Sequence, residues 1–223
     1  MAKRKLKKFA EVESFHNCFF LPFEQSKENG LPLKGKWHKE YFKNNNPIVL
    51  ELGCGKGEYT IGLAQRYPDK NFIGVDIKGS RIHTGAKTAV DTKMNNVAFV
   101  RTRIDFIEAC FAANEINEIW ITFPDPQPQK TRVRKRLTNM MFINRYKKFL
   151  IEGGVINLKT DNEPFYDFSR EVATENKFEI LDATNDLYAN TSSRDEVLTS
   201  IKTHYENIFT KKGFKICYLK FRV

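Results

Sequence analysis

The segment at residues 48–57 reads Ile48-Val49-Leu50-Glu51-Leu52-Gly53-Cys54-Gly55-Lys56-Gly57, an apolar run that ends in an acid and three glycines at alternate positions. The apolar run is typical of a buried parallel strand, and the glycines allow a sharp turn that a ligand can approach closely. Residues 58–66 can continue as a helix that ends before Pro68. A strand, a glycine loop and a helix in this order predict a small-molecule site at the carboxyl end of a parallel sheet.

The spacing of these glycines narrows the class of ligand. A dinucleotide fingerprint, G-x-G-x-x-G, would have its third glycine at the position of Glu58, and a G-x-x-x-x-G-K-[ST] phosphate loop would need Ser or Thr after Lys56. The order E-x-G-x-G-x-G instead resembles the first motif of class I methyltransferases, which bind S-adenosylmethionine (SAM). A glycine turn in an unrelated α/β domain is the open alternative.

A second apolar strand is predicted at residues 72–77 and carries Asp76 near its end. A carboxylate in this position can accept hydrogen bonds from both hydroxyls of a ribose, and such charge-assisted bonds are about twice as strong as neutral ones. Because NAD enzymes use the same arrangement, Asp76 predicts a nucleoside ligand without selecting SAM over NAD. A solvated strand end is the alternative.

The chain has 223 residues, of which 41% are hydrophobic, and this is enough for one core and one domain. None of its apolar runs approaches the roughly 20 residues that cross a bilayer, and no apolar signal region follows the basic start. The four cysteines and four histidines are dispersed, with no C-x-x-C pair. We therefore expect reduced thiols, a cytoplasmic protein and no metal site.

Two short basic segments account for the net charge of +10. Residues 3–8 and residues 130–136 each contain five Lys or Arg and no acid, and the remaining 27 positive and 27 negative side chains balance. Localised charge of this kind is an electrostatic footprint for a polyanion such as a nucleic acid. A solubilising tail together with a solvated helix start is the alternative.

The pattern of breaks and apolar runs divides the chain into two parts. Residues 1–46 are irregular in pattern and predict a basic N-terminal arm and cap, not an independent domain. Residues 47–223 predict an α/β methyltransferase domain with a Rossmann-like, doubly wound, mostly parallel seven-stranded sheet and an antiparallel last strand. We expect strands at 48–52, 72–77, 97–101, 118–123, 154–160, 178–183 and 214–221. We expect helices at 57–67, 79–94, 104–113, 136–150, 163–176 and 194–211, a polar loop at 190–193, and a closing glycine at Gly213.

The fourth predicted strand runs into the turn Pro124-Asp125-Pro126. Prolines on both sides restrict the backbone around Asp125, and a carboxylate at the carboxyl end of a central strand lies beside the ligand crevice of such a sheet. The basic segment at residues 130–136 follows directly. This stretch therefore joins a candidate catalytic acid to a candidate phosphate-binding surface.

Here the chain resembles the TrmB-type tRNA (guanine-N7)-methyltransferases, from about residue 47 to residue 223. Their hallmark F-P-D-P-W-P-K-K-R-H corresponds to residues 123–132, which read Phe-Pro-Asp-Pro-Gln-Pro-Gln-Lys-Thr-Arg. Residues 158–162 (Leu-Lys-Thr-Asp-Asn) and 203–206 (Thr-His-Tyr-Glu) resemble two further segments that contact substrate in the family. The resemblance implies Asp125 as the catalytic residue; cofactor contacts from Glu51, Gly53, Gly55, Gly57, Asp76, Asp105 and Asp125; substrate contacts from Gln129, Asp161, Thr203 and Glu206; and RNA contacts from Lys130, Arg132, Arg134, Lys135 and Arg136.

The chain departs from the family pattern at three positions. Gln127 stands in place of the usual Trp, and Gln129 in place of a substrate-contacting Lys, so an uncharged donor replaces a cation and Lys130 could take over its role. After the third strand, the position of the usual acid holds Arg103, and Asp105 two residues later could serve instead. The adenine end of the site therefore has two candidate residues.

The prediction is an enzyme that transfers the methyl group of SAM to N7 of a guanine in tRNA, in the variable loop as the resemblance implies. N7 carries a lone pair and no proton, so the reaction needs orientation and charge stabilisation and no strong general base. We expect Asp125, Asp161 and Glu206 to accept hydrogen bonds from guanine N1–H and the exocyclic amine. A helix cap is the structural alternative for Asp161, and a solvated position for Glu206.

Two other functions stay open at this point. One is a class I methyltransferase that acts on rRNA or protein, and the other is a catalytically idle RNA-binding module of the same fold. The expected partners are tRNA and no membrane, and both a monomer and a homodimer are compatible with the sequence.

Overall fold

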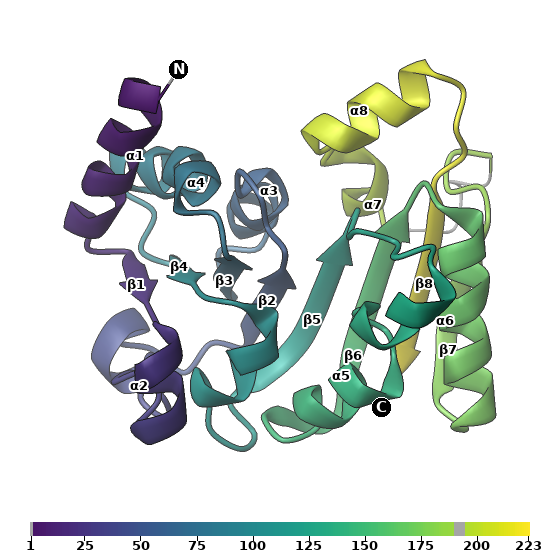
Figure 1. The fold of residues 1–223 in the computed structure, drawn as a ribbon, viewed down its shortest axis with the longest axis horizontal. Coiled ribbons are helices and arrows are strands. Elements are labelled where there is room, and N and C mark those ends of the chain that lie inside the picture. Colours follow the sequence, from purple (N-terminus) through teal and green to yellow (C-terminus); the bar gives the residue numbers. More distant parts are fainter. Residues whose placement is uncertain (1, 190–194) are drawn as a thin grey trace.

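The computed structural model describes residues 2–189 and 195–223, with side chains from residue 8 onward. The predicted polar loop at residues 190–193 lies outside the described residues, as do the side chains of the first basic segment before Lys8. A central sheet with helices on both faces forms the body of the molecule (Figure 1).

Eight strands form one sheet in the order β1-β4-β3-β2-β5-β6-β8-β7. β8 is antiparallel to both of its neighbours and all other pairs are parallel, so the antiparallel last strand is confirmed. The strands are β1 (Cys18–Phe20), β2 (Ile48–Leu52), β3 (Asn71–Asp76), β4 (Val97–Arg101), β5 (Ile116–Thr122), β6 (Leu150–Thr160), β7 (Glu179–Thr184) and β8 (Cys217–Arg222).

The sheet has one strand more than the seven predicted. β1 comes from the N-terminal region and pairs in parallel with β4, with Cys18 opposite Phe99, and the Asn17 carbonyl accepts a hydrogen bond of 2.8 Å from the Phe99 amide. Three residues are too few for an alternating pattern, so this strand has no sequence signal of its own. Residues 1–46 are also more regular than predicted, because they contain α1 (Ala2–Ser14), α2 (Phe23–Glu28) and the π-helix η1 (Trp37–Phe42).

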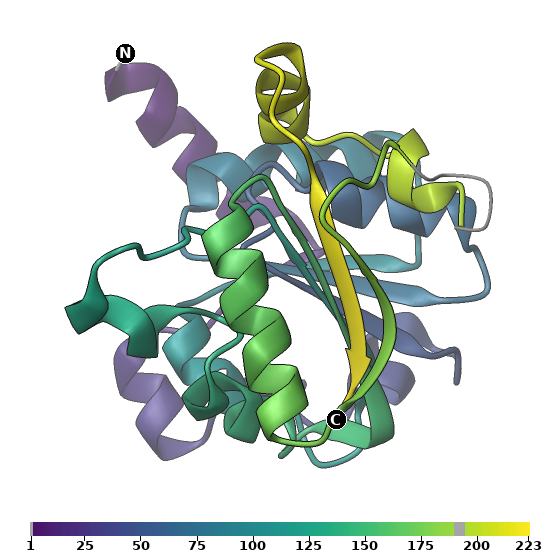
Figure 2. The ribbon, with the colours of Figure 1, turned by 90° about the vertical axis from the view of Figure 1, so that its right-hand side faces the viewer.

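The remaining helices cover both faces of the sheet, which confirms the doubly wound fold. They are α3 (Glu58–Arg66), α4 (Gly79–Asp91), α5 (Met140–Tyr146), α6 (Glu163–Glu175), α7 (Val197–Ser200), α8 (His204–Lys211) and the 3-10 helices η2 (Ile104–Ala109) and η3 (Lys130–Lys135). Alternate strand residues divide the core into two layers: Leu50 and Ile73 pack with residues of α5 and α6, and Val49 and Phe72 pack with residues of α3 and α4. Figure 2 views the β7–β8 edge of the sheet, with α6 and α7 on opposite sides of β8. None of the described helices is long and apolar enough to cross a membrane.

Two predicted helices are interrupted by capping residues. The helix predicted at 194–211 is divided into α7 and α8, because the Thr203 hydroxyl accepts a hydrogen bond of 3.1 Å from the Glu206 amide and caps the start of α8. The helix predicted at 136–150 is reduced to α5, which Asn139 caps in the same way. The residues predicted as a helix at 104–113 form only the short η2. Gly213 follows α8 with a φ of +80°, as predicted for a closing glycine.

One aromatic ring packs against three glycines that belong to separate elements. A Cβ atom would lie 2.7 Å from the Phe99 ring at Gly57 in the glycine loop, 2.8 Å at Gly74 in β3, and 2.7 Å at Gly85 in α4. Because protein interiors are packed to the density of crystals, no such atom fits. The loop, β3 and α4 therefore meet only because these three residues have no side chains.

Candidate functional site

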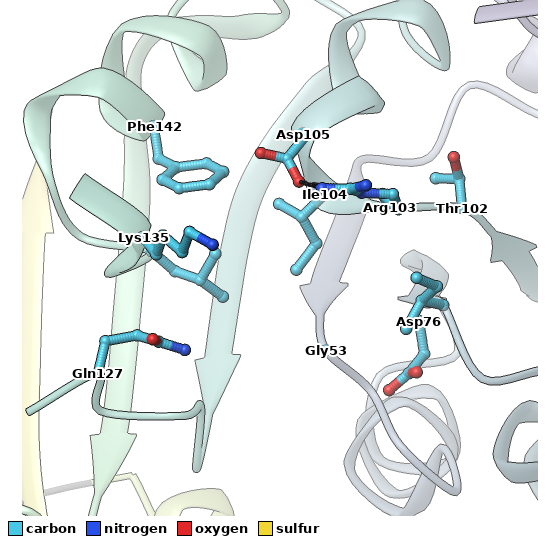
Figure 3. Close-up of a pocket in the computed structure, with 11 residues that line it drawn as sticks. Gly53, Asp76, Thr102, Arg103, Ile104, Asp105, Gln127, Lys135 and Phe142 are labelled. Atoms are coloured by element: carbon cyan, nitrogen blue, oxygen red, sulfur yellow. Dashed lines mark hydrogen bonds and ion pairs between the residues drawn. The ribbon is translucent and has the colours of Figure 1, made fainter. Parts of the chain in front are cut away.

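Two cavities adjoin the glycine loop, and Gly53 lines both. The larger, the Asp76 cavity, has a volume of about 310 Å³. In Figure 3 Asp76, Thr102, Arg103 and Asp105 face Gln127, Lys135 and Phe142 across this cavity. The smaller, the Tyr205 cavity, has a volume of about 100 Å³ and lies between the glycine loop, the end of β5 and the start of α8. Within the described part of the chain, no three His, Cys, Asp or Glu side chains come together to hold a metal ion.

The backbone amides of the glycine loop donate hydrogen bonds to a carbonyl and a carboxylate at the end of β3. The Gly53 amide donates to the Val75 carbonyl at 2.8 Å, and the Gly55 amide donates to one oxygen of Asp76 at 3.0 Å. The second Asp76 oxygen accepts from the Lys78 amide at 2.7 Å. Gly53 has a φ of +77°, and a Cβ there would meet no atom within 4 Å. This glycine therefore leaves the backbone open to the cavity, whereas Gly57 is required by packing against Phe99.

Glu51 lies beneath the loop and fastens it to the neighbouring elements. Its buried carboxylate accepts hydrogen bonds from the amide and hydroxyl of Thr60 at the start of α3, and from the Thr122 hydroxyl at the end of β5 at 2.6 Å. Burial raises the pKa of Glu51 to about 7. Glu51 is absent from the lining of both cavities. The structure thus shows it holding the loop in position, and its direct cofactor contact stays a prediction.

Both candidates for the adenine end of the site line the Asp76 cavity. Arg103 donates to Asp105 at 3.1 Å, and the two side chains form an ion pair (Figure 3). Ile77 and Ile104 line the same cavity, and Ile77 is 55% exposed although it is apolar. The cavity thus combines an apolar surface with a charged pair at its end.

The Pro-Asp-Pro turn is held by an arginine that was predicted to bind RNA. Asp125 is exposed, and one of its oxygens accepts from the Gln127 amide at 3.1 Å. Arg136 donates through Nε to the carbonyls of Pro126 and Gln127, at 3.2 and 3.3 Å, and its guanidinium lies 4.5 Å from the centre of the Phe168 ring. Arg136 therefore fixes the turn to α6, which is a positioning role that sequence analysis did not assign to it, and its RNA contact stays a prediction.

The other Lys and Arg side chains of residues 130–136 lie either in solvent or at the Asp76 cavity. Lys130, Arg132 and Arg134 are exposed on η3 and make no ion pair within the described residues. Lys135 lines the Asp76 cavity. Gln129 is exposed at the start of η3. Lys130, Arg132 and Arg134 thus meet solvent alone, whereas Lys135 is exposed and also faces the Asp76 cavity.

Asp161 and Thr203 lie at the ends of elements beside the crevice. Asp161 follows β6 and is partly buried, which raises the pKa of its carboxyl. Its neighbour Asn162 caps α6 by accepting from the Phe165 amide at 2.9 Å, so the capping alternative for Asp161 is wrong. Thr203 caps α8 and lines the Tyr205 cavity.

The structure buries Glu206, which sequence analysis placed against the substrate. Its side chain is 0% exposed and forms an ion pair of 2.9 Å with Lys159, which is also 0% exposed. The other partner is the Tyr188 hydroxyl, which donates at 2.8 Å. Burial lowers the pKa of Lys159, and the Glu206 carboxylate opposes that shift. Glu206 is therefore not at a solvated position, so that alternative is wrong. Its contact with the substrate guanine stays a prediction. The sequence signal for this pair was the lysine inside the apolar strand β6.

Comparison with known proteins gives the family. A family model described as "Putative methyltransferase" matches residues 45–219. A tRNA (guanine-N(7)-)-methyltransferase of Christiangramia forsetii is 50% identical over 222 residues, which are 100% of this chain and 99% of that protein. The chain belongs to the tRNA (guanine-N7)-methyltransferase family. A second such relative, from Bacteroides fragilis, is 48% identical over 99% of this methyltransferase and 86% of its own length.

Solved structures similar to this methyltransferase share its fold at low sequence identity. The 16S rRNA methyltransferase KamB superimposes with a TM-score of 0.62 at 14% identity, over 83% of this chain and 91% of that one. A 16S rRNA (adenine(1408)-N(1))-methyltransferase from Catenulisporales acidiphilia, solved with its cosubstrate SAM, gives a TM-score of 0.55 at 14% identity, over 85% and 90%. These structures support the class I methyltransferase fold.

Proposed function

We propose that this methyltransferase transfers the methyl group of SAM to N7 of a guanine in the variable loop of tRNA, in the cytoplasm. One observation carries the proposal: the Asp76 cavity has Gly53 and Asp76 on one wall, and Gln127 and Lys135 on the other. The wall that would bind a nucleoside thus faces the Pro-Asp-Pro turn and the basic helix η3. The similarity over the whole chain to enzymes named for this activity supports the same assignment.

The Asp76 cavity fits the adenosine part of SAM. Asp76 is only 8% exposed as a residue. Two amides fix its carboxylate, which keeps lone pairs that ribose hydroxyls would use. Ile77 and Ile104 offer apolar surface to a purine ring, and Gly53 leaves room beside the backbone. The volume agrees with small-molecule sites, which begin near ~300 Å³.

The chemistry assigns different tasks to cofactor and chain. SAM supplies a methyl group on a sulfonium, which is already a good leaving group. The chain orients the guanine and stabilises the positive charge that forms on the purine. Asp125 and Asp161 follow the neighbouring parallel strands β5 and β6, and both carboxylates can accept from guanine N1–H and the exocyclic amine. No side chain needs to remove a proton from N7.

Nucleoside mass spectrometry of bulk tRNA incubated with protein and SAM tests the proposed function. We expect 7-methylguanosine to appear, and to map to the variable loop when the modified tRNA is cleaved at that base. A different methylated nucleoside would contradict the reaction, and 7-methylguanosine in another part of tRNA would contradict the target position alone. Bulk rRNA incubated in the same way is the control substrate.

A further inference from the structure

Residues 202–215, which we call the α8 segment, carry two exposed aromatic rings that the proposed reaction does not use. Tyr205 is 44% exposed and Phe214 is 51% exposed. Both rings contact Phe209, Tyr205 nearly parallel to it at 6.4 Å and Phe214 edge-on at 5.9 Å. Phe209 therefore holds both rings in place, and each ring is partly exposed to solvent. Exposed apolar side chains that are grouped in this way mark an interaction site.

A row of rings connects the α8 segment to the Pro-Asp-Pro turn. Phe209 also stacks on Phe123, with ring centres 6.4 Å apart, and Phe123 immediately precedes Pro124. Tyr205 lines the second cavity beside the glycine loop, and its hydroxyl accepts from Arg81 at 3.5 Å. Figure 1 places α8 above the carboxyl end of β5. Tyr205 thus lies beside the glycine loop, and Phe214 is connected to it through Phe209.

The exposed charge of the α8 segment is entirely positive. Its single carboxylate, Glu206, is buried and paired with Lys159. Four lysines of the segment are exposed: Lys202, Lys211, Lys212 and Lys215. Lys215 pairs with Asp186 at 3.4 Å, whereas Lys211 and Lys212 make no ion pair within the described residues. Cations therefore flank the exposed rings, and this favours a polyanion as partner.

We propose that Tyr205 and Phe214 are a stacking surface for unpaired nucleotides of tRNA beside the target guanine, and that Lys211 and Lys212 bind the adjacent phosphates. The inference rests on the proposed function, because it takes tRNA as the substrate. Aromatic rings next to lysines are typical of surfaces that bind single-stranded nucleic acid, in which a base stacks on each ring. Loops present such unpaired bases, whereas the stems of tRNA do not.

Equilibrium binding of unmodified tRNA to single variants tests the stacking surface. We expect Tyr205→Ala and Phe214→Ala each to raise the Kd by about 5- to 150-fold, the usual loss for one stacked base. The matched control is Phe23→Ala, because Phe23 is 47% exposed and lies on α2, far from α8 in Figure 1. Tyr205→Phe and Phe214→Tyr keep the rings and should bind as the wild type does. SAM affinity should be unchanged in both Phe214 variants and in Phe23→Ala.

The salt dependence of binding separates stacking from charge. The aromatic variants should keep the wild-type slope of log Kd against log salt, whereas Lys211→Ala with Lys212→Ala should make it shallower by roughly 1.5 units. A Kd for Tyr205→Ala and Phe214→Ala equal to that of Phe23→Ala would overturn the proposal, as would a change of oligomeric state with unchanged tRNA affinity. A wild-type protein that methylates no tRNA would overturn the proposed function instead, and binding is measured without turnover, so the two failures are distinguishable.

Discussion

The side of the crevice that we propose for the cofactor and the side that we propose for the substrate differ in how their functional groups are held in place. On the cofactor side, backbone amides fix Asp76 and a buried carboxylate, Glu51, joins the loop to its neighbours. On the substrate side, Asp125 and η3 are exposed, and Arg136 fastens the turn through a few long-range contacts. The proposed small-molecule site is thus built into the sheet, whereas the proposed RNA site lies on the surface.

The largest effect on the free energy of unfolding is expected from Glu206→Ala. This substitution tests whether a buried ion pair stabilises the substrate side, as buried Glu51 stabilises the cofactor side. The substitution leaves Lys159 buried without its ionic partner, and breaking such a pair costs about 3–5 kcal/mol. Urea unfolding should show a loss of this size in the free energy of unfolding. The double variant Glu206→Leu with Lys159→Met should recover much of it, because an apolar pair leaves no uncompensated charge. Normal stability of Glu206→Ala combined with lost turnover would indicate that Glu206 contacts the substrate and does not mainly stabilise the fold.

Asp125→Asn tests the exposed part of the substrate side. The asparagine keeps an acceptor for the Gln127 amide, so we expect a normal fold and normal tRNA and SAM affinities. Turnover should fall by about two orders of magnitude or more, as for the loss of one oriented transition-state contact. Single-turnover methylation of tRNA measures this directly. Near-normal turnover would remove Asp125 from the mechanism.

Glu51→Gln tests the buried support of the cofactor side through the pH dependence of stability. Burial raises the pKa of Glu51 from 4.5 to about 7, so the folded state binds a proton that the unfolded chain releases. The resulting stabilisation is complete below about pH 4.5 and is lost as the pH rises to about 7, up to about 3 kcal/mol in total. Relative to the glutamine variant, the wild type should become less stable over that range. Parallel curves of unfolding free energy against pH would contradict the raised pKa.

Asp76→Ala tests the ligand contact of the cofactor side. Hydrogen bonds to a charged group contribute about 1.5–3 kcal/mol, so SAM affinity measured by calorimetry should fall by roughly 10- to 150-fold. Asp76→Asn is the matched control, because the asparagine keeps an acceptor for the Gly55 amide. It therefore separates the loss of the ribose contact from a distortion of the glycine loop. Equal SAM affinity in wild type and both variants would exclude a ribose contact.

The smallest effect per substituted residue is expected for the exposed arginines of η3, and it concerns tRNA binding. Replacing both Arg132 and Arg134 with Ala should make the salt dependence of tRNA binding shallower by about 1.5 units, because two phosphate contacts are lost. Arg136→Ala should leave that slope unchanged and lower turnover, since Arg136 holds the turn. An equal change of slope in both variants would show that Arg136 binds RNA after all.

The same contrast explains how far the sequence could predict the molecule. The bounds of β2 and β4 agree with the prediction, because long apolar runs between glycines and polar residues define buried strands. The lysine inside the apolar strand β6 indicated a buried ionic partner, but the sequence did not identify that partner, because Glu206 is distant from Lys159 in the chain and meets it only after the sheet has formed. The lysines of the α8 segment were also missed as a possible RNA-binding surface. The total numbers of positive and negative side chains outside the two basic segments are equal, and acids elsewhere in the chain offset these lysines in that total.

The contact between Phe99 and three glycines also has an evolutionary consequence. A side chain at Gly57, Gly74 or Gly85 can be accommodated only if residue 99 becomes smaller, so the tolerated substitutions at these four positions depend on one another. The glycine loop is expected to vary in concert with β4, which is not its neighbour in the sheet but lies two strands away. A smaller residue at position 99 would relieve only this one contact, because a Cβ at Gly85 would also lie 2.8 Å from the Lys56 carbonyl oxygen, and one at Gly74 would lie 2.8 Å from the Thr60 hydroxyl.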